Sequence, residues 1–400
     1  MLRAASSTIK RVAAIDPPAE RPAGWAGGFA LLFCCWVPVL LTLGRFVTTA
    51  REHAFAYDFH SYYWLGGHYV LHGHSPFPPP TPAAPLLDHV YPAGPYPAPV
   101  PVLFAPFALL PVQLAQVIFT AIVIAALFFA LRLVGVHDWR CYGAALLWAP
   151  VAFGIQTANL TLLLVLGLAI LWRFRHQVAG PALIVGVLVS LKLFLWPLSI
   201  WLLATRRYAA AAWSIVVATA ILLGSWALLG FAGFRDYPRV VRIFSSYYET
   251  ATYTPFASLV KLGLPTPWAR ACGLALGVAA LAAVFVTARR NRSEATAFTL
   301  AVAAALLLTP LVWLHYFALL LIPLAVLTPT FSLAWLLPAI LWACPVGPTA
   351  SGPTWTYALP LVVCTIVLVL AHRVRWRPRS TAPGEAQAIT SMKRLSAQFR

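Results

Sequence analysis

The chain has 400 residues, of which 61% are apolar and only 10% are charged, and its formal net charge is +18. A soluble domain of this size carries about a quarter of its residues as Asp, Glu, Lys or Arg, so the composition excludes a soluble globular protein. The basic residues gather in the tails and in short turns between apolar runs, which is typical of cytoplasmic membrane-protein segments and argues against nucleic-acid binding.

The first apolar run covers residues 24–47 and follows a polar stretch at 1–23. It is long enough to span a bilayer, so we predict an anchoring helix after a cytoplasmic N-terminal tail rather than a cleaved signal peptide. Two long segments, at about 48–98 and 231–267, lack the basic clusters of the short turns. The alternation of sides therefore predicts that both are external loops.

The other apolar runs predict an all-α polytopic membrane protein with about 12 transmembrane helices in a domain over 24–371. A basic tail at 372–400 is expected in the cytoplasm, as an even number of helices requires. Pairs of short helices between 141 and 204 indicate a cavity or a locally thinned membrane. The run 99–111 is too short to span and leads into the second helix. The predicted helices are 24–47, 112–135, 141–156, 159–173, 179–190, 193–204, 208–230, 268–288, 294–311, 315–328, 331–345 and 355–371.

The first external loop contains six histidines, four of them clustered between residues 60 and 74, and the apolar runs contain or adjoin all six cysteines of the chain. No Cys or His spacing typical of a zinc site occurs, and the histidines lack an evident third ligand and supporting partners. We therefore predict neither a disulfide nor a metal site, and no cofactor. The clustered histidines are His60, His68, His72 and His74.

Only ten carboxylates occur in the chain, so an external site that needs one has few candidates. Asp58 stands just past the first helix, in a stretch to about His72 that is able to lie as an amphipathic helix along the membrane interface. Tyr62 and Trp64 surround it with aromatic rings, which suit an interfacial belt as well as the apolar faces of sugars. Asp58 is thus either a functional carboxylate or an interfacial residue that caps the following helix. The external candidates are Glu52, Asp58, Asp88, Asp236 and Glu249.

Two further ionisable residues stand in apolar surroundings. His315 lies inside a long apolar region, where an ionisable side chain indicates function unless its neutral ring bonds a carbonyl freed by Pro310. Lys192 is a lone cation at the external turn of a short helix pair, against the positive-inside bias. It is placed either to bind a lipid-linked phosphate or to reach the interface as an ordinary snorkelling lysine.

Several segments occur together in the order found in glycosyltransferase family 87, which the chain resembles over about residues 25–330. The resemblance is to transferases of GT-C architecture that use a polyprenyl-phosphate sugar, and among them to the actinobacterial mannosyltransferases that elongate phosphatidylinositol mannosides. Ala93 departs from the commoner Tyr-Pro-Pro pattern. The matching segments are Asp58-Phe59-His60-Ser61-Tyr62 with Leu71-His72-Gly73; Tyr91-Pro92 with 104–111; Gln156 with Asn159; 186–194; and Pro310 with Trp313, His315 and Tyr316.

The resemblance implies an inverting transfer of mannose from polyprenyl-phosphate mannose to a mannosylated phosphatidylinositol in α-1,2 linkage. It implies Asp58 as catalytic base and His315 at the leaving phosphate, where we also expect Lys192. The reaction is expected at the periplasmic or extracellular side of the plasma membrane, among membrane lipids and without nucleic acid. A same-fold transferase for another sugar such as arabinofuranose and a lipid or solute transporter are the alternatives. Expected sugar or acceptor contacts are His60, Tyr62, Trp64, Gln156, Asn159, Trp313 and Tyr316.

Overall fold

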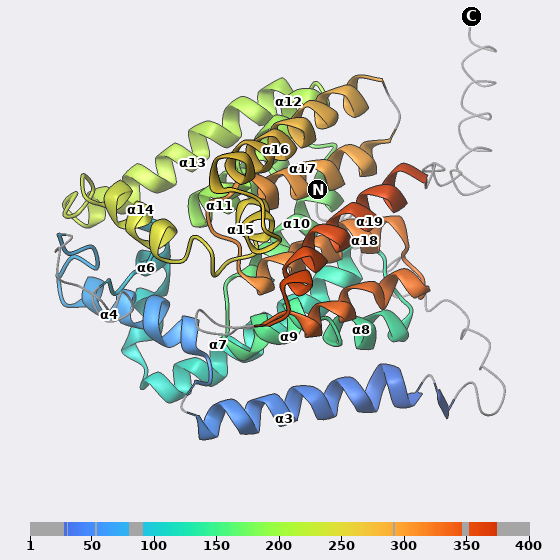
Figure 1. The fold of residues 1–400 in the computed structure, drawn as a ribbon. Coiled ribbons are helices and arrows are strands. Elements are labelled where there is room, and N and C mark those ends of the chain that lie inside the picture. Colours follow the sequence, from blue (N-terminus) through green and yellow to red (C-terminus); the bar gives the residue numbers. More distant parts are fainter. Residues whose placement is uncertain are drawn as a thin grey trace, which may run out of the picture.

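The computed structural model describes residues 28–29, 31–52, 54–79, 91–290, 293–345 and 352–373. Within these ranges the ordered elements are all helices, and no strand is formed (Figure 1). The N-terminal tail predicted at 1–23 lies outside the described residues. So does the tail predicted at 372–400, apart from its first two residues.

Five helices of the described chain are long and apolar enough to cross a membrane, judged by length and composition. Four of them agree within a few residues with the runs expected to span, and the first is Leu32–Arg51 instead of 24–47. Large apolar side chains stay exposed on them, including Leu40 at 61% and Leu274 at 63%, as hydrocarbon surroundings permit. The five are Leu32–Arg51 (η1 Leu32–Trp36 and α3 Val37–Arg51), α7 Val112–Leu133, α13 Tyr208–Leu228, α16 Thr266–Arg289 and Thr354–Arg373 (η8 Thr354–Ala358 and α19 Leu359–Arg373).

The other helices are shorter, so the predicted count of 12 membrane-crossing helices is not confirmed. Some of these shorter helices belong to the body of the bundle and others to the two long loops. In chain order they are η2 Phe59–Trp64, α4 Leu65–Leu71, α6 Pro99–Phe104, η3 Ala105–Leu109, α8 Trp139–Leu146, α9 Ala149–Gln156, α10 Thr161–Phe174, α11 Ala179–Leu191, η4 Leu193–Leu195, α12 Pro197–Ala204, α14 Tyr237–Tyr247, α15 Pro255–Lys261, α17 Glu294–Leu308, η5 Leu314–Leu320, α18 Leu321–Leu327, η6 Leu333–Trp335 and η7 Leu337–Ala343.

Proline explains two differences from the predicted helices. The run 141–156 forms two helices because Pro150 stands in the first turn of α9. Proline is tolerated there, since the first turn of a helix does not need its N–H, but its ring disfavours a helical turn before it, so α8 cannot continue into α9. The run 331–345 forms only 3₁₀ turns around Pro338. The second of the two helices formed by 141–156, α9, ends at Gln156 as predicted, beside the first loop.

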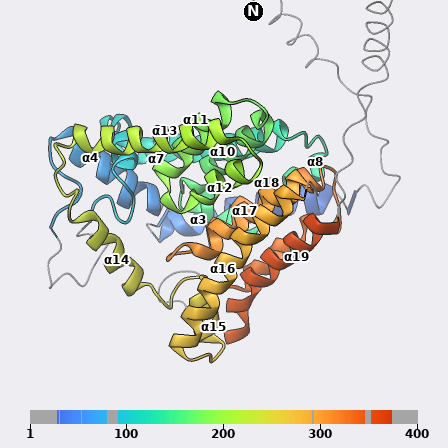
Figure 2. The same ribbon diagram turned by 90° about the horizontal axis from the view of Figure 1, so that it is seen from above.

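The helices α10 and α17 lie in the middle of the bundle, whereas α3 runs along one side and α13 and α16 along another (Figure 1). Seen from above, α16 and α19 form one edge and α14 lies apart from them (Figure 2). The centre contains large buried rings, such as Phe298, whose centroid is 5.2 Å from that of Trp172 and 5.3 Å from that of Trp201. Packing in the middle is thus dense, while the long outer helices keep apolar faces outward.

Ion pairs join three segments at one end of α10. Glu294, the first residue of α17, receives Arg175 at 3.3 Å and Arg207 at 2.5 Å. Both arginines come from turns predicted to be cytoplasmic, so the structure brings these turns to the same end of the bundle. Asn159 lies at the opposite end of α10, about 20 Å away at 1.5 Å per helical residue.

The first external loop folds onto the start of the bundle through a close backbone approach. Gly67 of α4 faces the peptide that joins Phe104 and Ala105, and a Cβ at residue 67 would lie 2.7 Å from the Phe104 oxygen. The loop is therefore fixed against α6 and η3, and it carries η2 with it.

Candidate functional site

A cavity of about 260 Å³ lies between the first external loop, the end of α9, α14 and the start of η5. Two of the ionisable residues singled out in the sequence, Asp58 and His315, line it together, although 257 positions separate them. Aromatic rings form much of the remaining wall. They are Tyr57, Tyr62, Tyr96, Phe153, Phe244, Tyr248, Tyr253, Trp313 and Tyr316.

Backbone contacts with the end of α9 hold Asp58 in place. The Ala56 amide donates to the Gln156 oxygen at 2.9 Å, and the Phe59 amide donates to the Thr157 oxygen at 3.3 Å. Ala56 has φ of 52°, a left-handed conformation that turns the chain sharply just before Asp58. The carboxylate thus stands at the start of η2 and faces the cavity.

The side chain of Asn159 donates to Asp58, with Nδ2 2.6 Å from Oδ2. Its other atom, Oδ1, accepts from the Thr161 amide at 2.9 Å and from the Thr161 hydroxyl at 2.7 Å. Because two donors hold Oδ1, the NH₂ group must point to Asp58. Asn159 is fully buried, so this contact fixes the carboxylate from the protein side.

Two buried phenols continue the network. Tyr63 donates to the Tyr96 hydroxyl at 2.9 Å and accepts from the Leu160 amide at 3.1 Å, and Asn159 Nδ2 lies 3.4 Å from the Tyr96 hydroxyl. Burial raises the pKa of Tyr63 and of Tyr96 well above 10, and the Asp58 charge raises both further. Both phenols therefore stay protonated, and the negative charge in this network belongs to Asp58.

His315 lies at the start of η5, after the extended residue Trp313, and is 8% exposed. Its Nε2 atom is buried and finds no hydrogen-bond partner within the described chain. A buried ring nitrogen without a partner costs about 1–3 kcal/mol, so a ligand that bonds it would recover this loss. Since His315 lines the cavity, that ligand would lie in the same space that the Asp58 carboxylate faces.

Lys192 follows α11 in the turn to η4 and is 6% exposed. Its Nζ atom donates to the Tyr316 hydroxyl at 2.5 Å and lies 4.1 Å from the centre of the Tyr96 ring. Burial lowers the pKa of Lys192 to about 7, while the Asp58 charge acts in the opposite direction. Lys192 is thus poised to change charge near neutral pH.

Lys192 lines a second cavity, of about 320 Å³, and does not line the first. Tyr96 and Tyr316 line both cavities, so their rings form the partition between them. Phe194 supports the partition by stacking on Tyr316, with ring centroids 5.1 Å apart. The structure therefore brings Lys192 next to the cavity of Asp58 and His315, across a shared aromatic wall.

Of the seven residues expected to contact sugar or acceptor, Tyr62, Trp313 and Tyr316 line the first cavity, and Asn159 bonds Asp58 behind its wall. The other three, His60, Trp64 and Gln156, do not line it. His60 is exposed, and the Trp64 indole donates to the Leu110 oxygen at 3.2 Å.

Gln156 takes part in a contact that the sequence analysis missed. Its Oε1 accepts from Nε of Arg45 at 3.0 Å, and the Arg45 guanidinium lies 4.7 Å from the centre of the Phe153 ring, which lines the first cavity. Arg45 is a charged residue in the first long apolar helix, which was the signal available in the sequence.

Tyr96 is the other residue that the sequence analysis missed. It stands between Pro95 and Pro97 in a segment read only as a loop, and its neighbours come from sites up to 220 positions away. Among the described residues, no group of three or more His, Cys, Asp or Glu side chains is close enough to hold a metal ion.

Comparison with known protein families gives one match. The model of glycosyltransferase family 87 matches residues 95–313, which is more than half of the chain and includes Asn159 and Lys192. No curated protein and no solved structure matches the chain.

Proposed function

Since the chain belongs to glycosyltransferase family 87, we propose that it transfers mannose from polyprenyl-phosphate mannose to a mannosylated phosphatidylinositol. The bond formed is an α-1,2 linkage, and the reaction takes place at the outer face of the plasma membrane. Family membership supports the general activity, a glycosyltransferase of the membrane, and the five long apolar helices agree with it.

The observation that carries this proposal is the shared cavity of Asp58 and His315, in which Asn159 fixes the carboxylate. With a β-linked donor and an α-linked product, the anomeric carbon inverts in a single displacement. The acceptor hydroxyl oxygen bonds to that carbon as the bond to the phosphate oxygen breaks. Asp58 takes the hydroxyl proton, and the polyprenyl phosphate leaves with the bonding electrons.

Negative charge grows on the leaving phosphate during this step, so the site needs a positive charge or a hydrogen-bond donor there. His315 lines the cavity and has a buried ring nitrogen without a hydrogen-bond partner, and Lys192 stands behind the partition formed by Tyr96 and Tyr316. We assign both to the phosphate. The aromatic walls, including Tyr62 and Trp313, would then bound the sugar.

The proposed sidedness follows from the two ends of α10. Arg175 and Arg207 gather at one end, and basic turns favour the cytoplasm. Asn159 and the cavity of Asp58 belong to the other end, which supports a site facing the periplasm or the outside. Both termini are then expected in the cytoplasm.

The direct test incubates the purified protein with labelled polyprenyl-phosphate mannose and mannosylated phosphatidylinositols, followed by analysis of the lipids. A labelled glycolipid with one more α-1,2-linked mannose is expected. A parallel incubation with polyprenyl-phosphate arabinofuranose tests the choice of sugar. Transfer from the arabinose donor in place of the mannose donor would overturn the proposed sugar but retain the transferase.

A further inference from the structure

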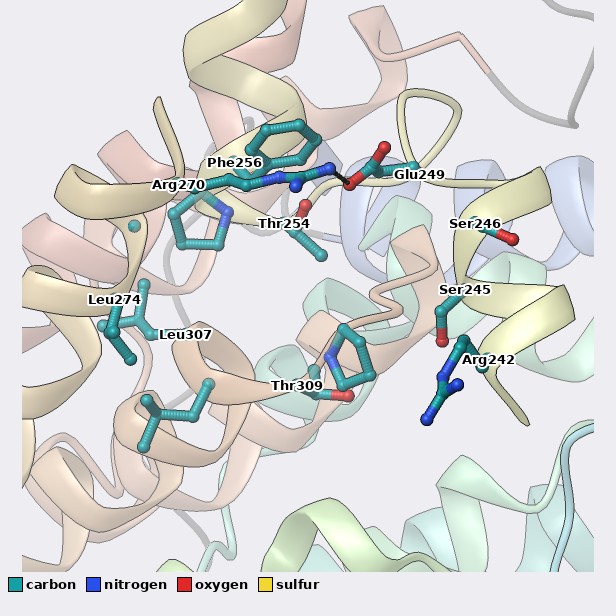
Figure 3. A pocket seen from close by; sticks show the side chains of 14 residues that line it. Arg242, Ser245, Ser246, Glu249, Thr254, Phe256, Arg270, Leu274, Leu307 and Thr309 are labelled. Atoms are coloured by element: carbon teal, nitrogen blue, oxygen red, sulfur yellow. Dashed lines mark hydrogen bonds and ion pairs between the residues drawn. The ribbon is translucent and has the colours of Figure 1, made fainter. Parts of the chain in front are cut away.

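A third cavity, of about 440 Å³, lies outside the site of Asp58, between α14, α15, α16 and the end of α17 (Figure 3). It shares residues 308–310 with the second cavity, which Lys192 lines. Phe244 on the inner face of α14 and Tyr248 just after the helix line the first cavity, while the outer face of α14 borders the third. The third cavity is therefore a neighbour of both others.

One wall of this cavity is polar, and its spare donors belong to Arg242, because the Ser245 and Ser246 hydroxyls donate to backbone oxygens of α14. Arg242 is exposed and makes no hydrogen bond or ion pair with the rest of the described chain, and Ser245 and Ser246 stand beside it three and four residues along α14. At this spacing the three side chains share one face of the helix. Figure 3 shows Arg242 and Ser245 on one side of the space and Arg270, from α16, on the other.

The charges around the cavity sum to a single positive one. Arg270 donates to Glu249 at 2.6 Å, which offsets one guanidinium, and Arg242 stays without a counter-charge. A guanidinium has five N–H donors, so Arg270 keeps donors beyond those that Glu249 uses. One net positive charge with several spare donors fits a singly charged phosphodiester.

Apart from Arg270, the wall opposite Arg242 is apolar, and we expect it to face the membrane. Leu274 lines the cavity, is 63% exposed, and belongs to α16, one of the five long apolar helices. Leu307 and Leu308 extend this wall. A space lined by two arginines and by leucines open to lipid fits an amphiphile, whose phosphate meets the arginines and whose chains follow α16.

We propose that this cavity binds the phosphodiester of the acceptor glycolipid and so presents its sugar to the neighbouring site of Asp58. This assignment rests on the proposed transfer to a phosphatidylinositol-type lipid. The donor phosphate already has His315 and Lys192, which leaves the third cavity for the second lipid.

The test compares two acceptors on the purified full-length protein: a mannosylated phosphatidylinositol, and a neutral alkyl mannoside that lacks the phosphate. Arg242→Gln should raise KM for the phosphate-bearing acceptor about ten- to a hundredfold, as expected for a lost hydrogen bond to a charged group. KM for the alkyl mannoside and for the donor should stay unchanged. Arg242→Lys should recover part of the loss because it keeps the charge.

Arg239→Gln is the matched control, because Arg239 is exposed on the same helix, carries the same charge and does not line the cavity. It should leave KM for both acceptors unchanged. An equal loss with both acceptors in Arg242→Gln, or an equal effect of Arg239→Gln, overturns the proposal. A rise in KM for the donor alone would assign the cavity to the lipid carrier and overturn it as well.

A binding measurement tests the lipid phosphodiester site independently of the proposed mannose transfer. Native mass spectrometry of the purified protein should detect retained phosphatidylinositol in the wild type and its loss in Arg242→Gln, whether or not any sugar is transferred. Inorganic phosphate should not displace the lipid, since it has no chains to contact Leu274. Displacement by phosphate, or equal retention by both proteins, overturns the assignment to a lipid phosphodiester.

Discussion

The side-chain amide of Asn159 donates to the carboxylate of Asp58 over 2.6 Å, although the two residues are 101 positions apart in the chain. This contact joins the first external loop to the start of α10 and turns the carboxylate toward the cavity that His315 also lines. The proposed base and the proposed contact to the leaving group are thus brought together only by the tertiary structure. Each of them can be tested separately.

Asp58→Asn should lower kcat by about 10²- to 10⁴-fold, the range for the loss of a general base. The amide has nearly the same shape but takes no proton from the acceptor hydroxyl. Initial rates with labelled donor give the result, and donor binding with the unfolding temperature serves as the control. Turnover close to that of the wild type would contradict the assignment of the base.

Asn159→Ala should lower kcat about tenfold and change KM for the donor little, because a hydrogen bond to a charged group contributes about 1.5–3 kcal/mol and fixes the carboxylate. Thr161→Val is the matched control, since it removes only the hydroxyl that bonds Asn159 Oδ1 and leaves the Thr161 amide as donor. A loss in the control as large as in Asn159→Ala would mean that the local fold, rather than the contact with Asp58, is responsible.

The affinity for the donor should fall as the pH rises above about 7. Burial lowers the pKa of Lys192 to about 7 in the donor-free protein, and a bound phosphate would raise it by charge attraction. At a pH between these two pKa values, donor binding is accompanied by protonation of Lys192. KM for the donor therefore rises with pH in this range, by at most about tenfold per pH unit.

Lys192→Arg keeps its proton throughout this window and should flatten that dependence. Lys192→Met should raise KM already at low pH and also flatten the profile. The control is KM for a neutral alkyl mannoside acceptor, which should not follow the pH in this way. If KM for the donor depends on pH as steeply in Lys192→Arg as in the wild type, Lys192 is not the group that causes the dependence.

His315→Ala should reduce kcat/KM for the donor about 10²- to 10³-fold, as is found when one donor to a developing negative charge is removed. Nε2 of His315 has no partner in the described structure, so the substitution removes no hydrogen bond made through that atom. His315→Asn, which retains an N–H donor, should restore part of the activity at an unchanged unfolding temperature. Equal activity of the two variants would argue against a hydrogen bond to the phosphate.

Gly67→Ala should destabilise the protein by about 1–3 kcal/mol, the usual cost of overpacking. The new Cβ would meet the backbone at Phe104 and Ala105 within 2.7–2.9 Å, and backbone atoms cannot turn aside as a side chain does. Gly44→Ala is the control, because nothing lies within 4 Å of a Cβ there. Thermal unfolding in detergent measures both, and equal unfolding temperatures would contradict the close packing of α4.

Hydrophobic length made the five long helices predictable, because a bilayer demands about 20 apolar residues whatever the helix packs against. The shorter elements depend on packing and on single prolines, so Pro150 divided a run that was read as one helix. The second long loop was read without structure, yet α14 forms there. Its buried residues Val240, Phe244 and Tyr248 recur every four positions, a helical signal that was present in the sequence.

The site was predictable as a set of residue types and not as an arrangement. Asp58, Lys192 and His315 attract notice because a charged or ionisable group in apolar surroundings is costly. That Asp58 and His315 share one cavity while Lys192 belongs to the next depends on the position of Tyr96, for which no pattern in the sequence gave a signal.

Tyr96 and Tyr316 belong at once to the chamber of the carboxylate and to the chamber of the lysine. A ligand that moves either ring in one chamber would change the wall of the other, so we expect the binding of donor and acceptor to be coupled. We therefore expect catalysis to pass through a single assembly that holds both substrates together.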